Sequence, residues 1–142
     1  MLKYMLDTDI SIYIIKRRPV ALMDVFNQYD EQMAISSITL SELIHGAEKS
    51  ANPKRNMYNV ECYLSGLEVL DYGRKASAHY GDIRADLERK GTLIGVNDLH
   101  IAAHARSEAL IIVTNNRREF DRVAGLRVEN WLDVCAKQES GE

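Results

Sequence analysis

The sequence predicts an α/β fold built on a central parallel sheet, and three observations support this. The chain has 142 residues, a length that suits one domain. Its residues are 46% apolar and 27% charged, which supplies material for a core and excludes a wholly disordered chain. Short apolar runs alternate with longer stretches of helical spacing. Strands separated by helices pair in parallel through right-handed crossovers, so a three-layer α/β domain follows.

The first half of the chain is expected to hold three strands and four helices. Residues 3–6 form a short buried strand that ends at Asp7, and a helix over 10–15 follows it. A second helix starts at Pro19, which suits a first helical turn, and reaches 29. A weak strand over 33–35 precedes a helix over 39–50 with apolar residues at helical spacing. Pro53 starts a helix that reaches 64, Gly66 ends it, and residues 67–70 form the third strand.

The second half is expected to add two strands and to end in a tail. A long helix over 74–90 is closed by Gly91, and a helix over 97–107 follows. The run LIIV at 110–113 is the clearest buried strand, and a helical turn over 117–123 leads to a strand near 127–129. The last residues are polar, so we place the domain over 1–132 and a polar C-terminal tail over 133–142.

Charge, cysteine content and hydropathy narrow the class of protein. The formal net charge of −3 disfavours a nucleic-acid clamp that works by bulk positive charge. Cys62 and Cys135 are too few for a disulfide scaffold or an all-thiolate zinc site, so two reduced thiols are expected. The N-terminus lacks the apolar core of a signal peptide, and no apolar run approaches the roughly 20 residues of a membrane span. We therefore expect a soluble cytoplasmic protein that does not contact membranes.

Acidic residues follow the predicted strands. Asp7 and Asp9 follow the first strand, Glu42 comes after the second, and Asp98 lies near the start of the helix before the fourth. The carboxyl ends of parallel strands share one edge of the sheet, where ligands bind. Carboxylates that converge there repel one another unless they hold a hard cation, and Mg²⁺ commonly completes its shell with phosphate oxygens. The matching chemistry is metal-assisted hydrolysis of a phosphodiester.

Each acid also has a purely structural interpretation. Asp9 could cap the helix that follows it. The run from Thr39 to Glu42 matches a capping box, and Asn97 with Asp98 could be a capping residue and a first-turn acid. Residue types and spacing alone leave both interpretations open for every acid. The histidines at 100 and 104 have the spacing of a zinc pair but lack a third ligand, so packing roles are expected for them.

Four segments of the chain resemble a known family. They are MLDTDISIYI, ISSITLSELIHGAEKS, GTLIGVNDLHIAAHARS and LIIVTNNRREFDRVAGLRVENW. In this order they resemble the four motif regions of PIN-domain ribonucleases, and they are most similar to the VapC toxins of bacterial VapBC toxin–antitoxin pairs. The resemblance covers nearly the whole chain. It implies a PIN-like α/β/α sandwich and an endoribonuclease that depends on Mg²⁺, for which Mn²⁺ can substitute.

The resemblance also implies roles for individual residues. Asp7, Glu42 and Asp98 match the three motif acids, which makes them catalytic residues and metal ligands. Thr114 matches a threonine that hydrogen-bonds the acid cluster. The first motif usually reads DTN, whereas here Asp9 stands third; we expect it to keep a capping role, and the alternative is an added negative charge beside the metal.

The fourth motif departs from the family where an acid often stands, because that position is Asn116. We expect Asn116 to fix the local turn, and Glu119, one helical turn further on, to approach the metal as a fourth catalytic acid. Asp121 should then point elsewhere, since it lies roughly 200° from Glu119 around a regular helix. The alternative is that Glu119 only pairs with a nearby surface arginine.

Substrate and partners follow from the same resemblance. The expected substrate is RNA, with tRNA and the anticodon loop of initiator tRNA first, so that cleavage stops translation. The expected partners are a VapB-type antitoxin and a second copy of the chain, with a larger toxin–antitoxin complex that reaches operator DNA only through the antitoxin. Arg117 and Arg118 follow the fourth strand and are the expected phosphate contacts. The helix over 10–15 is expected to be buried on more than one face, against the second copy or the antitoxin.

Two rival functions remain open at this point. One is a non-catalytic nucleic-acid-binding regulatory module on the same fold. The retention of Asp7, Glu42 and Asp98 argues against it, because a module without chemistry has no need for three acids that repel one another. The other is a structure-specific DNA nuclease of the same superfamily, which tends to carry insertions that grip a duplex; no such insertion is apparent in this sequence.

Overall fold

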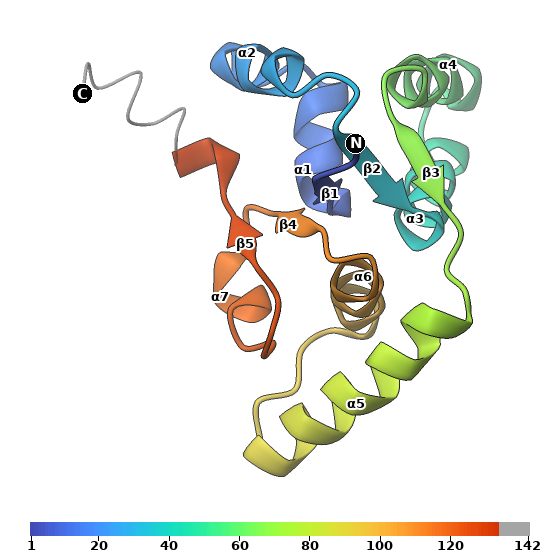
Figure 1. Ribbon diagram of the computed structural model, residues 1–142. Coiled ribbons are helices and arrows are strands. Elements are labelled where there is room, and N and C mark those ends of the chain that lie inside the picture. Colours follow the sequence, from blue (N-terminus) through green and yellow to red (C-terminus); the bar gives the residue numbers. More distant parts are fainter. Residues whose placement is uncertain (134–142) are drawn as a thin grey trace.

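A five-stranded parallel sheet lies at the centre of the computed structural model, which describes residues 1–133 (Figure 1). Its strands are β1 (Tyr4–Leu6), β2 (Met33–Ser36), β3 (Glu68–Leu70), β4 (Ile111–Val113) and β5 (Val128–Glu129). Their order across the sheet is β3-β2-β1-β4-β5, and every pairing is parallel. The predicted parallel sheet is confirmed. Apart from Asp133, the predicted polar tail lies outside the described residues.

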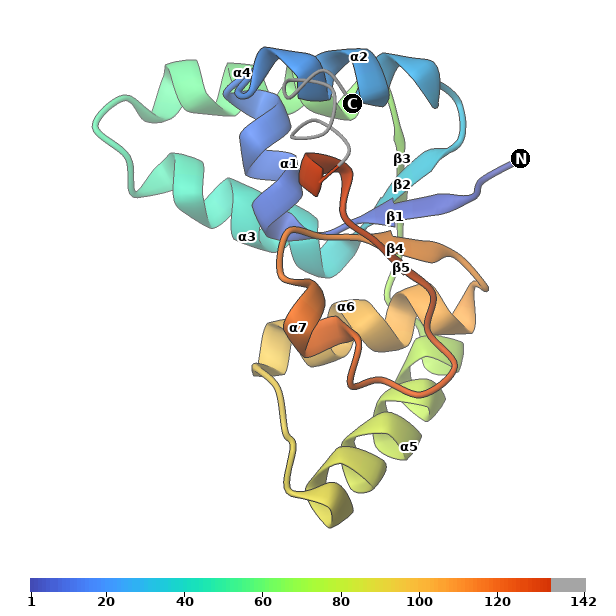
Figure 2. The ribbon, with the colours of Figure 1, turned by 90° about the vertical axis from the view of Figure 1, so that its left-hand side faces the viewer.

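The strand order reverses at β1, and this reversal places helices on both faces of the sheet. From β1 the chain moves outward through β2 to β3, then returns past β1 to β4 and β5. The outward path carries α1 (Thr8–Ile15), α2 (Val20–Gln28), α3 (Ser37–Glu48) and α4 (Pro53–Leu64). The return path carries α5 (Arg74–Lys90), α6 (Val96–Ser107) and α7 (Arg117–Phe120). Right-handed crossovers in opposite directions put the two sets on opposite faces, as Figure 2 shows, which gives the three layers.

The side chains of the strands alternate between two apolar cores, as the pleat of a strand requires. Tyr4 and Leu6 pack with buried side chains of α1 to α4 and with Trp131. Met5 and Ile112 pack on the other face with α5, α6 and the segment after β4. Because both of their faces are covered, the three inner strands β2, β1 and β4 are almost entirely apolar in sequence rather than alternating.

Three helices begin earlier than the sequence suggested. Asp7, the residue directly after β1, is the N-cap of α1, and Ser36 at the end of β2 caps α3. These strands therefore run into their helices without a loop. The prediction that Asp9 is the cap is wrong for this reason, and so is the capping-box interpretation of Glu42. Asn97 is not a cap either, since Gly95 occupies that position before α6.

Smaller observations concern the burial of α1 and the start of α2. Ile10 and Ile14 are buried within the chain, whereas Ile12 keeps 36% of its surface exposed, which leaves this face of α1 open to the expected partner. Pro19 is the N-cap of α2 and not its first helical residue. The long helix α5 has the predicted bounds and ends at Gly91, whose φ of 65° favours glycine. No helix among residues 1–133 combines the length and apolarity that crossing a membrane demands.

Candidate active site

Asp7 lies at the carboxyl end of β1, beside the point where the strand order reverses. Its backbone N–H donates a hydrogen bond of 3.0 Å to the carbonyl of Val113 at the end of β4. Its carboxylate accepts a hydrogen bond of 2.9 Å from the N–H of Ile10, and the side chain is 2% exposed. Crevices at such reversals are where open α/β sheets bind their ligands. Asp7 is thus a buried acid held on two sides by backbone hydrogen bonds.

Thr114 supports Asp7 from the next strand. This fully buried residue follows β4, and its hydroxyl is hydrogen-bonded to the carboxyl group of Asp7. The same oxygen accepts a bond of 2.8 Å from the backbone N–H of Asn116. The side chain of Asn116 caps nothing at the start of α7. The local turn is therefore fixed by the Thr114 hydroxyl and not by the Asn116 side chain, which corrects the expectation for Asn116.

Glu42 points from α3 toward residues of α1 and α6. One carboxylate oxygen accepts a 2.6 Å hydrogen bond from the hydroxyl of Thr8, and the other accepts a 3.2 Å bond from the amide of Asn97. Thr8 also contacts the hydroxyl of Thr39 at 3.2 Å. Glu42 is consequently held between the neighbours of Asp7 and Asp98, and its contacts run across the fold rather than to its own helix start.

Asp98 and Glu119 form a pair of carboxyl groups. Asp98 is partly buried in the first turn of α6, and the neighbouring carboxyl group of Glu119 on α7 contributes to the raised pKa of Asp98. Asp121 points elsewhere and pairs with Arg117 at 3.1 Å. The structure thus brings Glu119 to the acid cluster, as expected, and leaves Asp121 outside it.

The electrostatics of the cluster are those of acids that repel one another in a buried place. Burial is the main cause that raises the pKa of Asp7 to about 7; the hydrogen bonds from Thr114 and Ile10 oppose it, and the charges of Asp9 and Glu42 add to it. Burial likewise raises the pKa of Asp98 to about 7, with further contributions from Glu119, Asp7 and Asp9. Asp9 is exposed, and its part in the site is that of an added negative charge.

The donor set suits a hard divalent cation. All the converging ligands are carboxylate oxygens, and a cation would relieve the repulsion that raises both pKa values. Within residues 1–133, no three Asp, Glu, His or Cys side chains form a ready-made cage. Mg²⁺ does not need one, because it keeps several waters and binds through one or two carboxylates together with substrate phosphates. Asp7 and Asp98 fit this requirement, with Glu42 beside them.

Several residues that orient the acids could not be identified from the sequence. Thr8 and Asn97 hold Glu42, and Thr39 contacts Thr8. The one local signal was the hydroxyl of Thr8, which stands between the two acids of the DTD triplet. His104 is buried, and its ring nitrogen Nδ1 lies 2.7 Å from the hydroxyl of Ser36, which caps α3. This contact ties α6, which carries Asp98, to the start of the helix that carries Glu42.

The expected phosphate contacts lie next to the cluster but differ from each other. Arg117 and Arg118 open α7 and are both exposed. Arg117 is engaged by Asp121, so it can reach a phosphate only by leaving that ion pair. Arg118 takes part in none of the ion pairs formed within residues 1–133.

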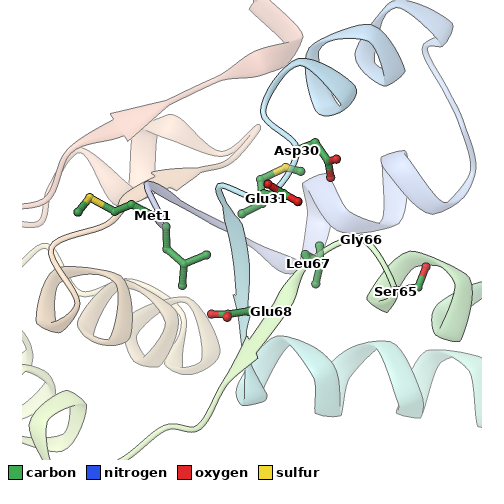
Figure 3. A pocket seen from close by; sticks show the side chains of 9 residues that line it. Met1, Asp30, Glu31, Ser65, Gly66, Leu67 and Glu68 are labelled. Atoms are coloured by element: carbon green, nitrogen blue, oxygen red, sulfur yellow. The ribbon is translucent and has the colours of Figure 1, made fainter.

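A pocket of about 500 Å³ lies at the opposite edge of the sheet (Figure 3). It is lined by residues that precede or begin β1, β2 and β3, among them Met1, Glu31 and Glu68. These positions are at the amino ends of the strands, whereas Asp7 and Thr114 follow the carboxyl ends. The pocket therefore takes no part in the acid cluster.

Comparison with known proteins identifies close relatives. The family model for the PIN domain matches residues 4–126. Ribonuclease VapC2 of Haemophilus influenzae is 59% identical over 132 residues, which are 93% of this chain and 100% of that protein. The tRNA(fMet)-specific endonuclease VapC of Salmonella typhimurium is 54% identical over 131 residues, which are 92% of this chain and 99% of that protein.

Solved structures agree with this. The DNA-bound VapBC of Salmonella typhimurium contains a chain that matches with a TM-score of 0.89 and 54% identity, over 92% of this chain and 99% of that one. VapBC2 of Rickettsia felis, bound to a DNA fragment from their promoter, matches with a TM-score of 0.86 and 40% identity, over 91% and 98% of the two chains. The expected PIN-like sandwich is confirmed.

Proposed function

Because this chain belongs to the PIN-domain family and, within it, to the VapC ribonucleases, we propose that it is a metal-dependent endoribonuclease and the toxin of a toxin–antitoxin pair. One observation carries the proposal. Acids from β1, α3 and α6 gather at the reversal of the strand order, where burial and mutual repulsion raise the pKa values of Asp7 and Asp98 to about 7. A protein without chemistry gains no stability from such a cluster, whereas a cation and a phosphate would balance it.

In this proposal Asp7, Asp98 and Glu42 hold the cation, with Glu119 beside them. Mg²⁺, or Mn²⁺ in its place, would make a water molecule more acidic and would neutralise charge that builds on the phosphate. Thr114 keeps the carboxyl group of Asp7 in place, and Thr8 with Asn97 fixes both oxygens of Glu42. Glu119 lies beside Asp98 and contributes to the raised pKa of that carboxyl group. Arg118 would contact the RNA backbone next to this cluster.

The substrate and partners are proposed from the relatives. The Salmonella typhimurium relative is named for cleavage of tRNA(fMet), so initiator tRNA is the proposed substrate, and its cleavage would stop translation in the cytoplasm. The related structures are VapBC complexes, two of them bound to DNA. We therefore propose a VapB-type antitoxin as partner, a homodimer of the toxin within the complex, and contact with operator DNA through the antitoxin alone.

The decisive experiment is cleavage of initiator tRNA by the purified chain, freed from any antitoxin. We expect cutting in Mg²⁺ or Mn²⁺ and none in EDTA. Asp7→Asn should slow cleavage by more than about a hundredfold, because even residues that only support a metal ligand are worth about 10–100-fold. Glu61→Gln on the exposed side of α4 is the matched control and should cut at the wild-type rate.

Two outcomes would reject the proposal. Cleavage of duplex DNA in preference to RNA would favour a DNA nuclease on the same fold. RNA binding without cleavage in any divalent cation would favour a regulatory binding module. Loss of activity in Asp7→Asn counts only if the variant keeps the circular dichroism spectrum of the folded chain.

A further inference from the structure

A shallow pocket beside the acid cluster has no role in the proposal so far. Its volume is about 380 Å³, and its lining consists of Asp9, Ile12, Tyr13 and Lys16 from the α1 segment together with Asn115. The four α1-segment residues recur at the spacing of one helix face, and all of them are exposed. Asn115 comes from the segment between Thr114 and Arg117. We call these five residues the rim pocket.

The rim pocket joins directly onto the catalytic acids. Asp9 is two residues beyond Asp7, and its charge is close enough to raise the pKa values of both Asp7 and Asp98. Asn115 directly follows Thr114, which is hydrogen-bonded to Asp7. A group bound in the rim pocket would therefore lie next to any phosphate held at the acid cluster.

The chemistry of the lining is that of a nucleotide subsite. Tyr13 is 39% exposed and, within residues 1–133, it has no ring partner, whereas Tyr4, Tyr29 and Tyr63 pack against other rings. Lys16 enters none of the ion pairs formed within that range. An exposed ring on which a base can stack, together with a cation for the backbone, is the combination by which proteins hold single-stranded RNA.

The polar groups of the pocket add selectivity. The carboxylate of Asp9 accepts hydrogen bonds only, so it pairs with the amino group of a base and repels a carbonyl oxygen at the same place. Asn115 can donate or accept. A protein partner would be expected to cover an apolar surface, but here a carboxylate, an amide and an ammonium surround only two apolar side chains.

We propose that the rim pocket binds one unpaired base of the RNA, next to the phosphate that is cut. The base stacks on Tyr13, donates its exocyclic amino group to Asp9, and has its backbone held by Lys16. The inference rests on the proposed ribonuclease function and adds to it a preference for an amino-bearing base over uracil. Asp9 is then a specificity-determining residue, which accounts for the acid that stands third in the DTD triplet.

Binding of short RNA strands in EDTA tests this without cleavage. The probes are fluorescent octamers of cytidine and of uridine, which differ at the base in the group that Asp9 would face, and affinity is read from fluorescence anisotropy. We expect the cytidine octamer to bind about fivefold more tightly than the uridine octamer. Tyr13→Leu should weaken binding of the cytidine octamer by about 5- to 100-fold, while Tyr13→Phe keeps the ring and most of the affinity.

Two further variants test the polar groups. Asp9→Asn should abolish the preference between the two octamers, because an amide can face either base. Lys16→Gln should weaken the binding of both octamers alike. It should also reduce the slope of the logarithm of affinity against the logarithm of salt concentration by about 0.7. Tyr58→Leu removes a ring from α4 that is even more exposed than Tyr13, at 69% against 39%, and is the control, with no change expected.

The possible results separate this inference from the function on which it rests. Unchanged RNA affinity in Tyr13→Leu, or an unchanged preference in Asp9→Asn, overturns the rim pocket while wild-type cleavage of tRNA stands. If Tyr13→Leu weakens only self-association or antitoxin binding, the face is a protein interface and the inference is wrong. A wild-type chain that neither binds nor cuts RNA would overturn both.

Discussion

Replacing Asp7 by asparagine should make the metal-free protein more stable while it removes activity. The pKa of this carboxyl group rises from 3.8 to about 7 on folding, chiefly because it is buried. At 1.36 kcal/mol per pKa unit, the charged form costs the fold about 4 kcal/mol above pH 7. Asparagine has nearly the same shape and caps a helix equally well.

The pH dependence of this effect has a definite sign. Folded Asp7 binds its proton more tightly than unfolded Asp7, so its cost to stability is small below about pH 4, grows as the pH rises to about 7, and is constant above that. The amide keeps the bond from Ile10 but loses the stronger attraction that a charged acceptor has for its donors. We therefore expect Asp7→Asn to raise the free energy of unfolding by about 2 kcal/mol at pH 8, and by well under half of that at pH 5.

Thermal unfolding without divalent cations measures this. For a chain of this length, 2 kcal/mol corresponds to a rise in Tm of roughly 5–10 °C at pH 8. Asp24→Asn, on the exposed side of α2, is the control and should shift Tm little at either pH. Added Mg²⁺ should raise the Tm of the wild type more than that of the variant. A variant that is less stable than the wild type at pH 8, or whose gain is the same at pH 5, would refute this account of the site.

Two further predictions concern the residues around the acids. Glu119→Gln should raise the Mg²⁺ concentration needed for half-maximal cleavage about tenfold, because it removes one of the acids around Asp98, whereas Asp121→Asn should leave that concentration unchanged. The measurement is a Mg²⁺ titration of cleavage by both variants. If Asp121→Asn needs more Mg²⁺ and Glu119→Gln does not, Asp121 is the relevant acid. Thr8→Val removes the 2.6 Å hydrogen bond to Glu42, so it should slow cleavage about 10–100-fold while unfolding free energy changes by about 1 kcal/mol. A normal rate in Thr8→Val would mean that Glu42 needs no such support.

The fold was largely predictable because its elements carry strong local signals. The strand at 110–113 is a pure apolar run, and the helix at 74–90 has both a clear period and a glycine at its end. The starts of α1 and α3 were misplaced because the helix caps follow the strands at once: Asp7 directly follows β1, and Ser36 is itself the last residue of β2. The residue type shows that Asp7 or Ser36 can cap a helix. It does not show that the helix starts directly after the strand, with no loop between the two.

The acids of the site could be proposed from their positions after strands, together with the family resemblance. Their supporting contacts could not, because they join residues far apart in the chain. Glu42 is held by Thr8 and Asn97, which are 34 and 55 positions away, and His104 meets Ser36 across 68 positions. No local period encodes such pairs, so only the folded chain reveals them.

The pairing of β1 with β4 has a consequence for synthesis of the protein. Tyr4 lies opposite Ile111, and the backbone N–H of Asp7 bonds to Val113, so the surroundings of Asp7 are completed by residues made more than a hundred positions later. A chain still growing on the ribosome holds Asp7 at the edge of an unfinished sheet, without Thr114 beside it. Closing such long-range contacts is slow and comes late in folding. The acid cluster is therefore completed only after the last third of the chain has been made.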